Sequence, residues 1–337
     1  MRALMLARIV PFVVAVCTVS AQTAPVALVR HAPVINGDIE GSIQQMLPES
    51  VTLNGAAIVA GDLFMPGSPS VRLNGKPAFG GTLPGTGATS PTNFTVTLNG
   101  GSRLGHLRTR TDAVELPTVG PPSSPSGSRN VSINRSSQSA GDFSTLRNLT
   151  LNGNTGQYSI PAGTYGDFTA NGNGGFTLGV AGATQPAVYA FQHLTLNGNA
   201  QLEVIGPVVI TMANGLSLNG RMGADSHPEW LLLRLATGGL TLNGNVTVAG
   251  YVAAPAGTVT INGNSRLTGG VISDRLVLNG ASTLQLIDLP PAISLTTPAD
   301  GQIFSAPAAA ISLQAAAADA DGLIAKVEFF ANGNKIG

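Results

Sequence analysis

The chain has 337 residues, with 17 basic and 17 acidic side chains, and only 10% of its residues are charged. This length is sufficient for two or three domains and a sizeable core, and the low charge argues against a partner held by electrostatic attraction. A nucleic-acid binder needs a basic patch that neutralises phosphates. The nearest approach is Arg103, His106, Arg108 and Arg110, which we interpret as part of a solvated strand or loop. No nucleic-acid partner is therefore expected.

Glycine and proline are abundant, with 43 and 22 residues, whereas aromatic residues make up only 5% of the chain. The hydrophobic content of 43% argues against disorder of the whole chain. Turn-rich β structure explains this composition, because each turn needs a residue that tolerates unusual backbone angles.

The first residues have the pattern of a signal peptide. Arg2 and Arg8 supply a positive start, 9–19 is an apolar stretch too short to span a bilayer, and Val19-Ser20-Ala21 fits the small-residue cleavage pattern. Residues 1–21 are thus predicted to be removed, so that the mature chain starts near Gln22. No later segment is long and apolar enough to span a membrane.

Cys17 is the only cysteine. A lipoprotein signal would use it, but Val16 is bulky where such signals usually carry a small residue. If the signal is removed, the mature protein has no disulfide, no cysteine-based metal site and no thiol nucleophile.

A motif of five residues recurs along the chain. It consists of an apolar residue, a second residue that is usually threonine, another apolar residue, asparagine and glycine. Its ten copies begin at Val51, Val71, Val96, Leu149, Phe168, Leu194, Leu216, Leu240, Val259 and Leu276. A degenerate eleventh copy, Val131 to Asn134, has Arg135 in place of glycine. From Asn152 to Asn279 the spacing between successive asparagines varies from 17 to 26 residues.

Strand geometry assigns a role to each position of the motif. Side chains alternate between two faces along a strand, so the two apolar positions should point inward and the threonine outward. Asn-Gly then supplies the positive φ angles that turn the chain. Asn-Gly is also a strong hairpin signal, but a meander of hairpins would place it about every 8–12 residues. The longer, variable spacing favours a right-handed parallel β-helix, or solenoid, in which like residues stack at about 4.8 Å.

The motif and the composition divide the chain into five parts. Residues 1–21 are the expected signal peptide, 22–117 the N-terminal solenoid rungs, and 118–128 a linker rich in Pro, Ser and Gly. The main solenoid is expected over 129–288, and Pro290-Pro291 marks the start of a different segment, 289–337.

The stretch from Leu240-Thr-Leu-Asn-Gly to Leu278-Asn-Gly resembles a bacterial family of exported β-helix domains of unknown function, whose members repeat LTLNGN. The resemblance covers about 140–288 and, more weakly, 31–117. It implies an exported all-β solenoid and brings no known catalytic residues.

The tail resembles the bacterial immunoglobulin-like (Ig-like) domain of long surface proteins. The matching residues are Pro290-Pro-Ala-Ile-Ser-Leu-Thr-Thr-Pro-Ala-Asp300-Gly and Ala317 to Gly333. A complete sandwich of this type has about 100 residues and seven strands. We therefore expect 289–337 to be a truncated Ig-like domain, a partial β-sandwich.

Candidate catalytic and metal-binding residues are few. Asp62, Asp142, Asp167 and Asp274 are scattered along the chain and form no pair that divides acid and base roles. Asp225-Ser-His227-Pro-Glu229 is the densest polar group and has possible metal ligands, but a loop before an apolar strand explains it better. Asp319-Ala-Asp321-Gly resembles part of a calcium loop and is better explained as a turn. We predict no catalytic residue, no cofactor and no metal.

The outward threonines could order water, as in ice-binding solenoids, but the neighbouring outward column, four residues before each asparagine, is irregular. Threonine also simply favours exposed strand positions. The sequons at Asn93, Asn148 and Asn245 are interpreted as by-products of threonine-rich strands in a bacterial protein.

Two classes of function remain open. The first is an exported, non-enzymatic structural or adhesive protein of the cell surface, with the solenoid as scaffold or interaction surface and surface polysaccharide or other surface proteins as partners. The second is a carbohydrate-binding or polysaccharide-cleaving β-helix protein. A cleft lined with carboxylates and aromatic residues would favour the second, and uniform Thr and Asn faces favour the first.

Overall fold

The computed structural model describes residues 13–18, 26–85, 91–110, 116–288, 292–298, 302, 310–318, 326–331 and 334–336. The chain divides into two compact units, one formed by 24–288 and the other by 1–23 together with 289–337. The two expected blocks of rungs and the segment between them therefore belong to one unit. The described residues are all-β apart from two single-turn 3-10 helices, η1 (Phe143–Thr145) and η2 (Pro228–Trp230).

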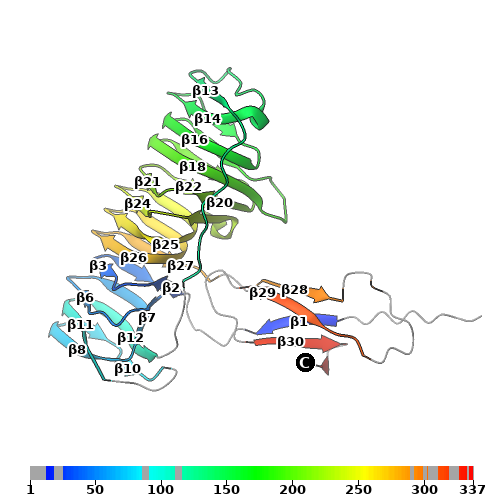
Figure 1. The fold of residues 1–337 in the computed structure, drawn as a ribbon. Helices are drawn as coiled ribbons and strands as arrows, with labels where there is room; N and C mark the ends of the chain where they lie inside the picture. The colour runs from blue at the N-terminus through cyan, green and yellow to red at the C-terminus, as the bar shows by residue number, and fades with distance from the viewer. Residues whose placement is uncertain are drawn as a thin grey trace, which may run out of the picture. The chain divides into compact units, whose positions relative to one another are not determined.

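Twenty-six strands of the unit formed by 24–288 belong to one sheet. Those before residue 111 are β2 (Val26–Val29), β3 (Val34–Ile35), β4 (Asp38–Glu40), β5 (Ser42–Gln45), β6 (Val51–Leu53), β7 (Ile58–Pro66), β8 (Ser68–Gly75), β9 (Ala78–Phe79), β10 (Thr82–Leu83), β11 (Pro91–Gly100) and β12 (Arg103–Arg110). Those after residue 128 are β13 (Arg129–Ile133), β14 (Leu146–Leu151), β15 (Gln157–Ser159), β16 (Gly163–Gly172), β17 (Gly175–Leu178), β18 (Ala187–Gly198), β19 (Gln201–Val204), β20 (Val208–Met212), β21 (Leu216–Leu218), β22 (Met222–Gly223), β23 (Leu231–Leu235), β24 (Leu240–Leu242), β25 (Thr247–Asn262), β26 (Arg266–Asn279) and β27 (Thr283–Leu286). Figure 1 shows them stacked one above another; we call this sheet the parallel stack.

Every pair of strands in the parallel stack is parallel, and the motifs lie opposite one another. Leu242 of β24 lies between Leu218 of β21 and Ile261 of β25, as the repeat predicts. The same register joins β14 to β16 and β16 to β18. The repeat therefore stacks like residues on like residues.

Burial follows the predicted alternation. The two apolar positions of the motif are buried in nine of its ten copies, and Leu242 is 0% exposed. Thr241, between them, is half-buried because its neighbours Ser217 and Thr260 stand directly beside it. Larger rings fill one part of the core, where Phe168 contacts Tyr165 and Phe191. Burial raises the pKa of Tyr165 to about 12, and its hydroxyl donates to the Pro161 carbonyl oxygen over 2.8 Å.

The order of strands in space differs from their order in the chain. The first strands of the parallel stack in chain order, β2 and β3, pair with β26, and β4 pairs with β27. The first strands of the chain order therefore lie against the last ones, β26 and β27. We call this contact the seam. From the seam the stack continues through β6 and β7 to β11 and β12, and then to β8, β9 and β10. Residues 91–110 are thus inserted between two segments that precede them in the chain.

The two ends of the parallel stack differ. At one end, Ile133 of β13 is 1% exposed, and Ala140 in the loop that follows is buried beside the same core. At the other end, Leu73 of β8 is 53% exposed although its counterpart Leu98 in β11 is buried. The motif at β8 is the one copy whose apolar residues lack a neighbour on one side.

Residues 116–128 contain no strand and run beside the parallel stack toward β13 (Figure 1). The Gln192 side chain donates to the Ser123 carbonyl oxygen over 3.2 Å, so part of this linker contacts β18. The chain returns along this route from one end of the stack to the other.

The smaller unit contains two short antiparallel sheets. In one, β1 (Val13–Thr18) pairs with β30 (Lys326–Ala331), which also pairs with β31 (Asn334–Lys335). In the other, β28 (Ala292–Thr297) pairs with β29 (Gln314–Ala318). The antiparallel pairs within 291–337, β28 with β29 and β30 with β31, agree with the expected Ig-like character of the tail, whereas β1 belongs to the expected signal peptide. Among the described residues, no helix has the length and apolar character needed to cross a membrane.

The register makes a sharp prediction about two adjacent residues. Leu242→Asp should abolish cooperative thermal unfolding of the stack, or destabilise it by at least about 3 kcal/mol, because it buries an unpaired carboxylate. Thr241→Asp, one residue away and half-exposed, should change stability by about 0.5 kcal/mol. Circular dichroism during heating measures both, and equal effects would contradict the register.

Candidate interaction surfaces

The asparagines of the motif form hydrogen-bonded ladders along the parallel stack. Each side-chain NH2 group donates to the Oδ1 oxygen of the asparagine in the neighbouring strand. The three runs are Asn36 to Asn279 to Asn262 to Asn243, Asn197 to Asn171 to Asn152 to Asn134, and Asn74 to Asn99 to Asn54, with N–O distances of 2.8–3.3 Å. In every run the donation points toward the β13 end.

Asn243 donates instead to the Ser217 hydroxyl, over 3.2 Å, where the ladder is interrupted. A second, shorter ladder follows the asparagine two positions later, with Asn199 donating to Asn173 and Asn264 donating to Asn245. The motif alone explains these residues as turn formers; their stacking role was missed. The recurrence of asparagine at the same motif position could have predicted the ladder. In strands paired in register, each side-chain amide has one donor group and one acceptor to share with its two neighbours.

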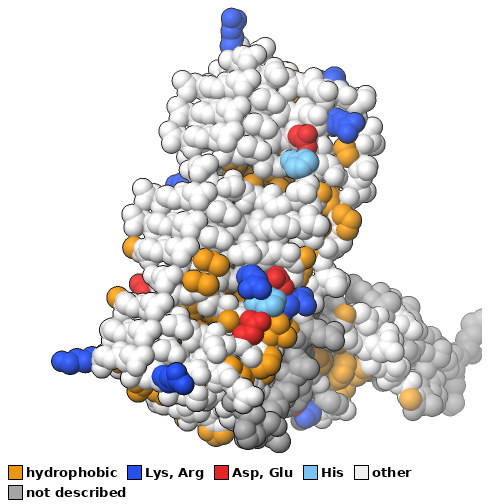
Figure 2. All heavy atoms as spheres, turned by 60° about the vertical axis from the view of Figure 1, so that its left-hand side comes forward, with side chains coloured by type: hydrophobic (Ala, Val, Ile, Leu, Met, Phe, Trp, Pro, Cys, Tyr) orange, Lys and Arg blue, Asp and Glu red, His pale blue; other side chains and the backbone are white. Residues whose placement is uncertain are grey.

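The threonines of the motif form an outward column beside the main asparagine ladder. Thr150, Thr169 and Thr195 lie directly opposite one another in register, and all three are half-buried. The column is interrupted at the seam, where Val277 lies opposite Val34, which is 46% exposed. Figure 2 shows that most of this face of the stack is neither charged nor hydrophobic.

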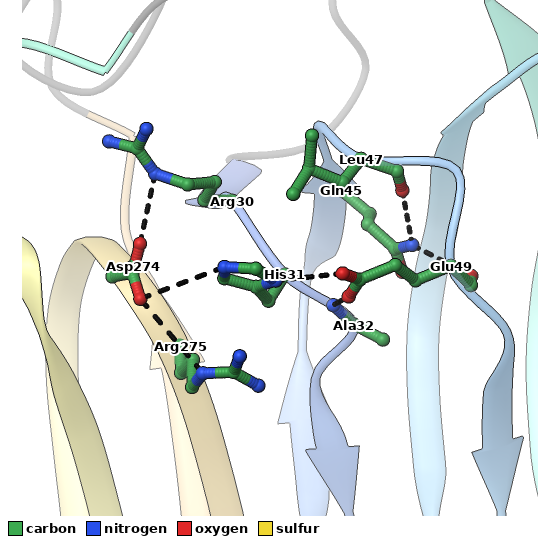
Figure 3. Close-up of polar contacts among 8 residues, drawn as sticks. All are labelled: Arg30, His31, Ala32, Gln45, Leu47, Glu49, Asp274 and Arg275. Carbon is green, nitrogen blue, oxygen red and sulfur yellow. Dashed lines mark hydrogen bonds and ion pairs between the residues drawn. The ribbon is translucent and has the colours of Figure 1, made fainter.

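Charged side chains gather at the seam, as Figure 3 shows. Asp274 of β26 binds Arg30 at 2.9 Å, and His31 Nδ1 lies 2.8 Å from Glu49. The second nitrogen of His31 lies 3.9 Å from Asp274, so this imidazole stands between two carboxylates from opposite sides of the seam. The backbone N–H of Ala32 donates to Glu49 over 2.8 Å and holds the pKa of that carboxyl below its usual value.

A second polar group lies on β7 and β12 and corrects the interpretation of the basic cluster. Asp62 accepts from His106 Nδ1 over 3.0 Å and from Arg108 Nε, and the carboxylate is largely buried. Arg110 is only 9% exposed and donates to Gln44. Of the four residues, Arg103 is exposed as predicted, His106 and Arg108 are partly exposed, and only Arg110 is buried. The sequence did not reveal the partners, because Asp62 precedes His106 by 44 residues.

The other candidate acids serve local structure. Asp142 caps η1 by accepting from the backbone N–H and the hydroxyl of Ser144, and the hydroxyl contact lowers its pKa. Asp167 lies 2.7 Å from His193 Nδ1.

The polar stretch 225–229 forms the loop that contains η2, as expected for a loop before a strand. Its His227 binds Glu229 at 2.7 Å and stacks on Trp230 at 4.0 Å between ring centres. No group of three metal-ligating side chains occurs within the described parts of the chain. Asp319 and Asp321 lie outside the described residues.

The main asparagine ladder should contribute measurably to stability. Asn262→Ala removes the donor to Asn243 and the acceptor for Asn279, and should cost about 1–2 kcal/mol because Asn262 is partly buried. Asn219→Ala is the matched control, because Asn219 occupies the same motif position and is exposed. Thermal or denaturant unfolding measures the difference, and equal losses in the two variants would exclude a ladder contribution.

Glu49 predicts a pH dependence with a defined sign. Since its pKa is lowered in the folded state, its stabilising contribution is present above the unfolded value of about 4.3 and is lost as pH falls through the folded value. Glu49→Gln should lower the unfolding temperature at pH 7 by a few degrees, and the loss of stability between pH 5 and pH 3 should be shallower. Asp38→Asn is an exposed control on β4. Parallel pH profiles for wild type and Glu49→Gln would contradict the assignment.

Comparison with known proteins identifies one segment. Residues 291–337 match the bacterial Ig domain family, in agreement with the resemblance of the tail. No curated protein and no solved structure matches the chain. Bacterial Ig domains are often found on extracellular proteins, and this match indicates a surface or structural role for the chain that carries it.

Proposed function

We propose that the protein is an exported structural or adhesive component of the bacterial cell surface, with the parallel stack as its scaffold and interaction surface. The observation that carries the proposal is the outer face on which threonine hydroxyls and asparagine amides align in register, combined with a C-terminal bacterial Ig domain. Repetition of one polar chemistry over many strands suits extended contact better than a single reaction centre.

The proposal includes a right-handed solenoid as the form of the stack. Its strands pair in parallel with strands one motif away, and the connections between them contain further strands. Parallel strands in one sheet are joined by right-handed connections in about 98% of cases, because the twist of the strands favours that hand. A solenoid of this kind needs neither disulfides nor a metal, since each coil is stabilised by its two neighbours.

The proposed role involves no catalysis. Acid–base chemistry uses two carboxyl groups held at a defined separation with different proton affinities. Asp62, Asp167 and Asp274 lie on different parts of the stack, and each contacts a histidine or an arginine. These contacts are the ones expected of side chains that hold neighbouring strands together.

Surface polysaccharide and other surface proteins are the proposed partners. The hydroxyl groups of a polysaccharide both donate and accept hydrogen bonds, as do the threonine hydroxyls and asparagine amides of the face. The low charge of the chain means that binding through this face should depend only weakly on salt.

Export is tested by sequencing the N-terminus of material recovered from the producing bacterium. The mature chain should begin at or near Gln22, and antibodies against the stack should label intact cells. A product that begins at Cys17 and carries a lipid would instead establish a lipoprotein. A full-length chain confined to the cytoplasm would overturn the proposed location.

Adhesion is tested by removing hydroxyl groups from the face without touching the core. The triple variant Thr150→Ala, Thr169→Ala and Thr195→Ala should keep its unfolding temperature within a few degrees and reduce binding to isolated surface polysaccharide or to partner cells at least tenfold. A matched control changes exposed residues outside the motif, Gln201→Ala and Val188→Ala. Unchanged binding by the triple variant would exclude the threonine column as the contact surface.

A further inference from the structure

The seam joins two segments as though they were consecutive in the chain. Leu286, the last residue of β27, lies opposite Gly269 of β26. Leu28 of β2 lies opposite Ile272 of the same strand, which places residue 26 at the level of residue 270. Residue 26 therefore lies where residue 287 would lie if β27 continued along β26 in the same register. We call residues 26–110 the N-block and residues 129–286 the C-block.

The contacts across the seam are specific as well as extensive. Three strands of the N-block pair with β26 and β27. Arg30 and His31 face Asp274, and Glu40 lies 3.3 Å from Arg266, so charges of opposite sign meet in two places (Figure 3 shows the first). Asn36 donates to Asn279 and continues the ladder over the seam. Such a surface is complementary to the matching block of any copy of this chain.

Only one covalent connection joins the N-block to the C-block. It runs from Arg110 to Arg129, nineteen residues further along the chain. Ten strand spacings separate the coil of β11 and β12 from β13, which is about 48 Å at about 4.8 Å per spacing. A polyproline-like chain of this length reaches about 59 Å. A linker of this length can therefore span the stack, with about 11 Å to spare in the polyproline form.

We propose that the seam is also a binding surface for a second copy of this chain, which docks by exchanging N-blocks. Each N-block would form the same seam with the C-block of the other copy, giving a closed twofold dimer. In a pair of stacks lying side by side in opposite directions, the β12 end of one stack lies beside the β13 end of the other. Each linker then needs only to cross between stacks, so a linker too short to span one stack can still serve the exchanged dimer.

The balance between the two forms depends on the linker. A linker that spans the stack gives the N-block a high effective concentration at its own seam, and this falls to nearly zero when the linker cannot reach. Shortening the connection below the span it must cross favours exchange between copies for the same reason. All seam contacts are kept in both forms, so the difference lies in the linker and in the protein concentration.

The test uses a disulfide across the seam as a reporter of which copy supplies the N-block. Asn36→Cys and Asn279→Cys, in a Cys17→Ser background, place two thiols at positions whose side chains already touch. In the chain with its natural linker, refolded at micromolar concentration, the disulfide should form within one chain. Deletion of residues 119–125 leaves eleven residues between the blocks. Their twelve Cα–Cα steps span at most about 43 Å when fully extended, and the disulfide should then join two chains.

Two controls separate linker length from sequence. Replacing 119–125 with seven Gly and Ser residues should leave the disulfide within one chain, and so should adding seven residues to the natural linker. Non-reducing electrophoresis and light scattering measure the products, and the natural chain refolded at several hundred micromolar should yield a minor dimer linked between chains. A monomeric deletion variant with its disulfide within one chain would overturn the proposal. So would a deletion variant that leaves the two thiols unpaired while the Thr and Asn rungs of both blocks remain protected from hydrogen exchange.

Discussion

The structure depends above all on the parallel hydrogen-bond ladder that joins each strand to strands about one motif away. A ladder in register brings the same motif position together in successive paired strands, so one choice of residue is repeated as a column. Leu242 and its counterparts become a continuous core, and Asn262 and its counterparts become a chain of amide hydrogen bonds. Stability then comes mainly from contacts between neighbouring strands. The same in-register pairing of like motif positions lets the N-block pack on the C-block although the two blocks are not consecutive in the chain.

The sequence predicted which side chains of each repeat point inward or outward, and it did not predict the order in which the repeats stack. Period-two alternation is a local property, and it correctly assigned Leu242 to the core and Thr241 to the outer side. The order of strands along the stack depends on which strand edges pair, and most of the pairing strands carry nearly the same motif. The two apolar residues and the asparagine of the motif are the same types in β8 and β11, which differ only in Arg72 against Thr97, yet β11 is the neighbour of β6. The partners of Asp62 and Asp274 were hidden for the same reason, since they come from coils far away in the chain.

The end of the stack at β8 shows how an open ladder avoids further pairing. Leu73 is exposed there because, among the described strands, β8 pairs with β11 on one side only. The same strand carries Pro69 and the exposed Arg72, and Lys76 and Pro77 follow it directly. Proline cannot donate to a new strand, and exposed basic side chains at an edge oppose pairing with an identical edge. Exchange of N-blocks at the seam therefore offers a second copy a better contact than end-to-end stacking at β8.

The seam also bears on how the outer face can be used. The threonine column ends at Thr260, continues as Val277 and Val34 across the seam, and resumes with Thr52 and Thr97. Two hydroxyl tracts are thus separated by an apolar pair, although the main asparagine ladder beside them continues through Asn279 and Asn36. A polysaccharide that bound hydroxyls along the whole stack would lose contacts at this break. A partner that binds one tract would not, and the longer tract belongs entirely to the C-block. The C-block thus retains its complete threonine tract whichever copy supplies the N-block, so adhesion through this face and exchange at the seam are compatible.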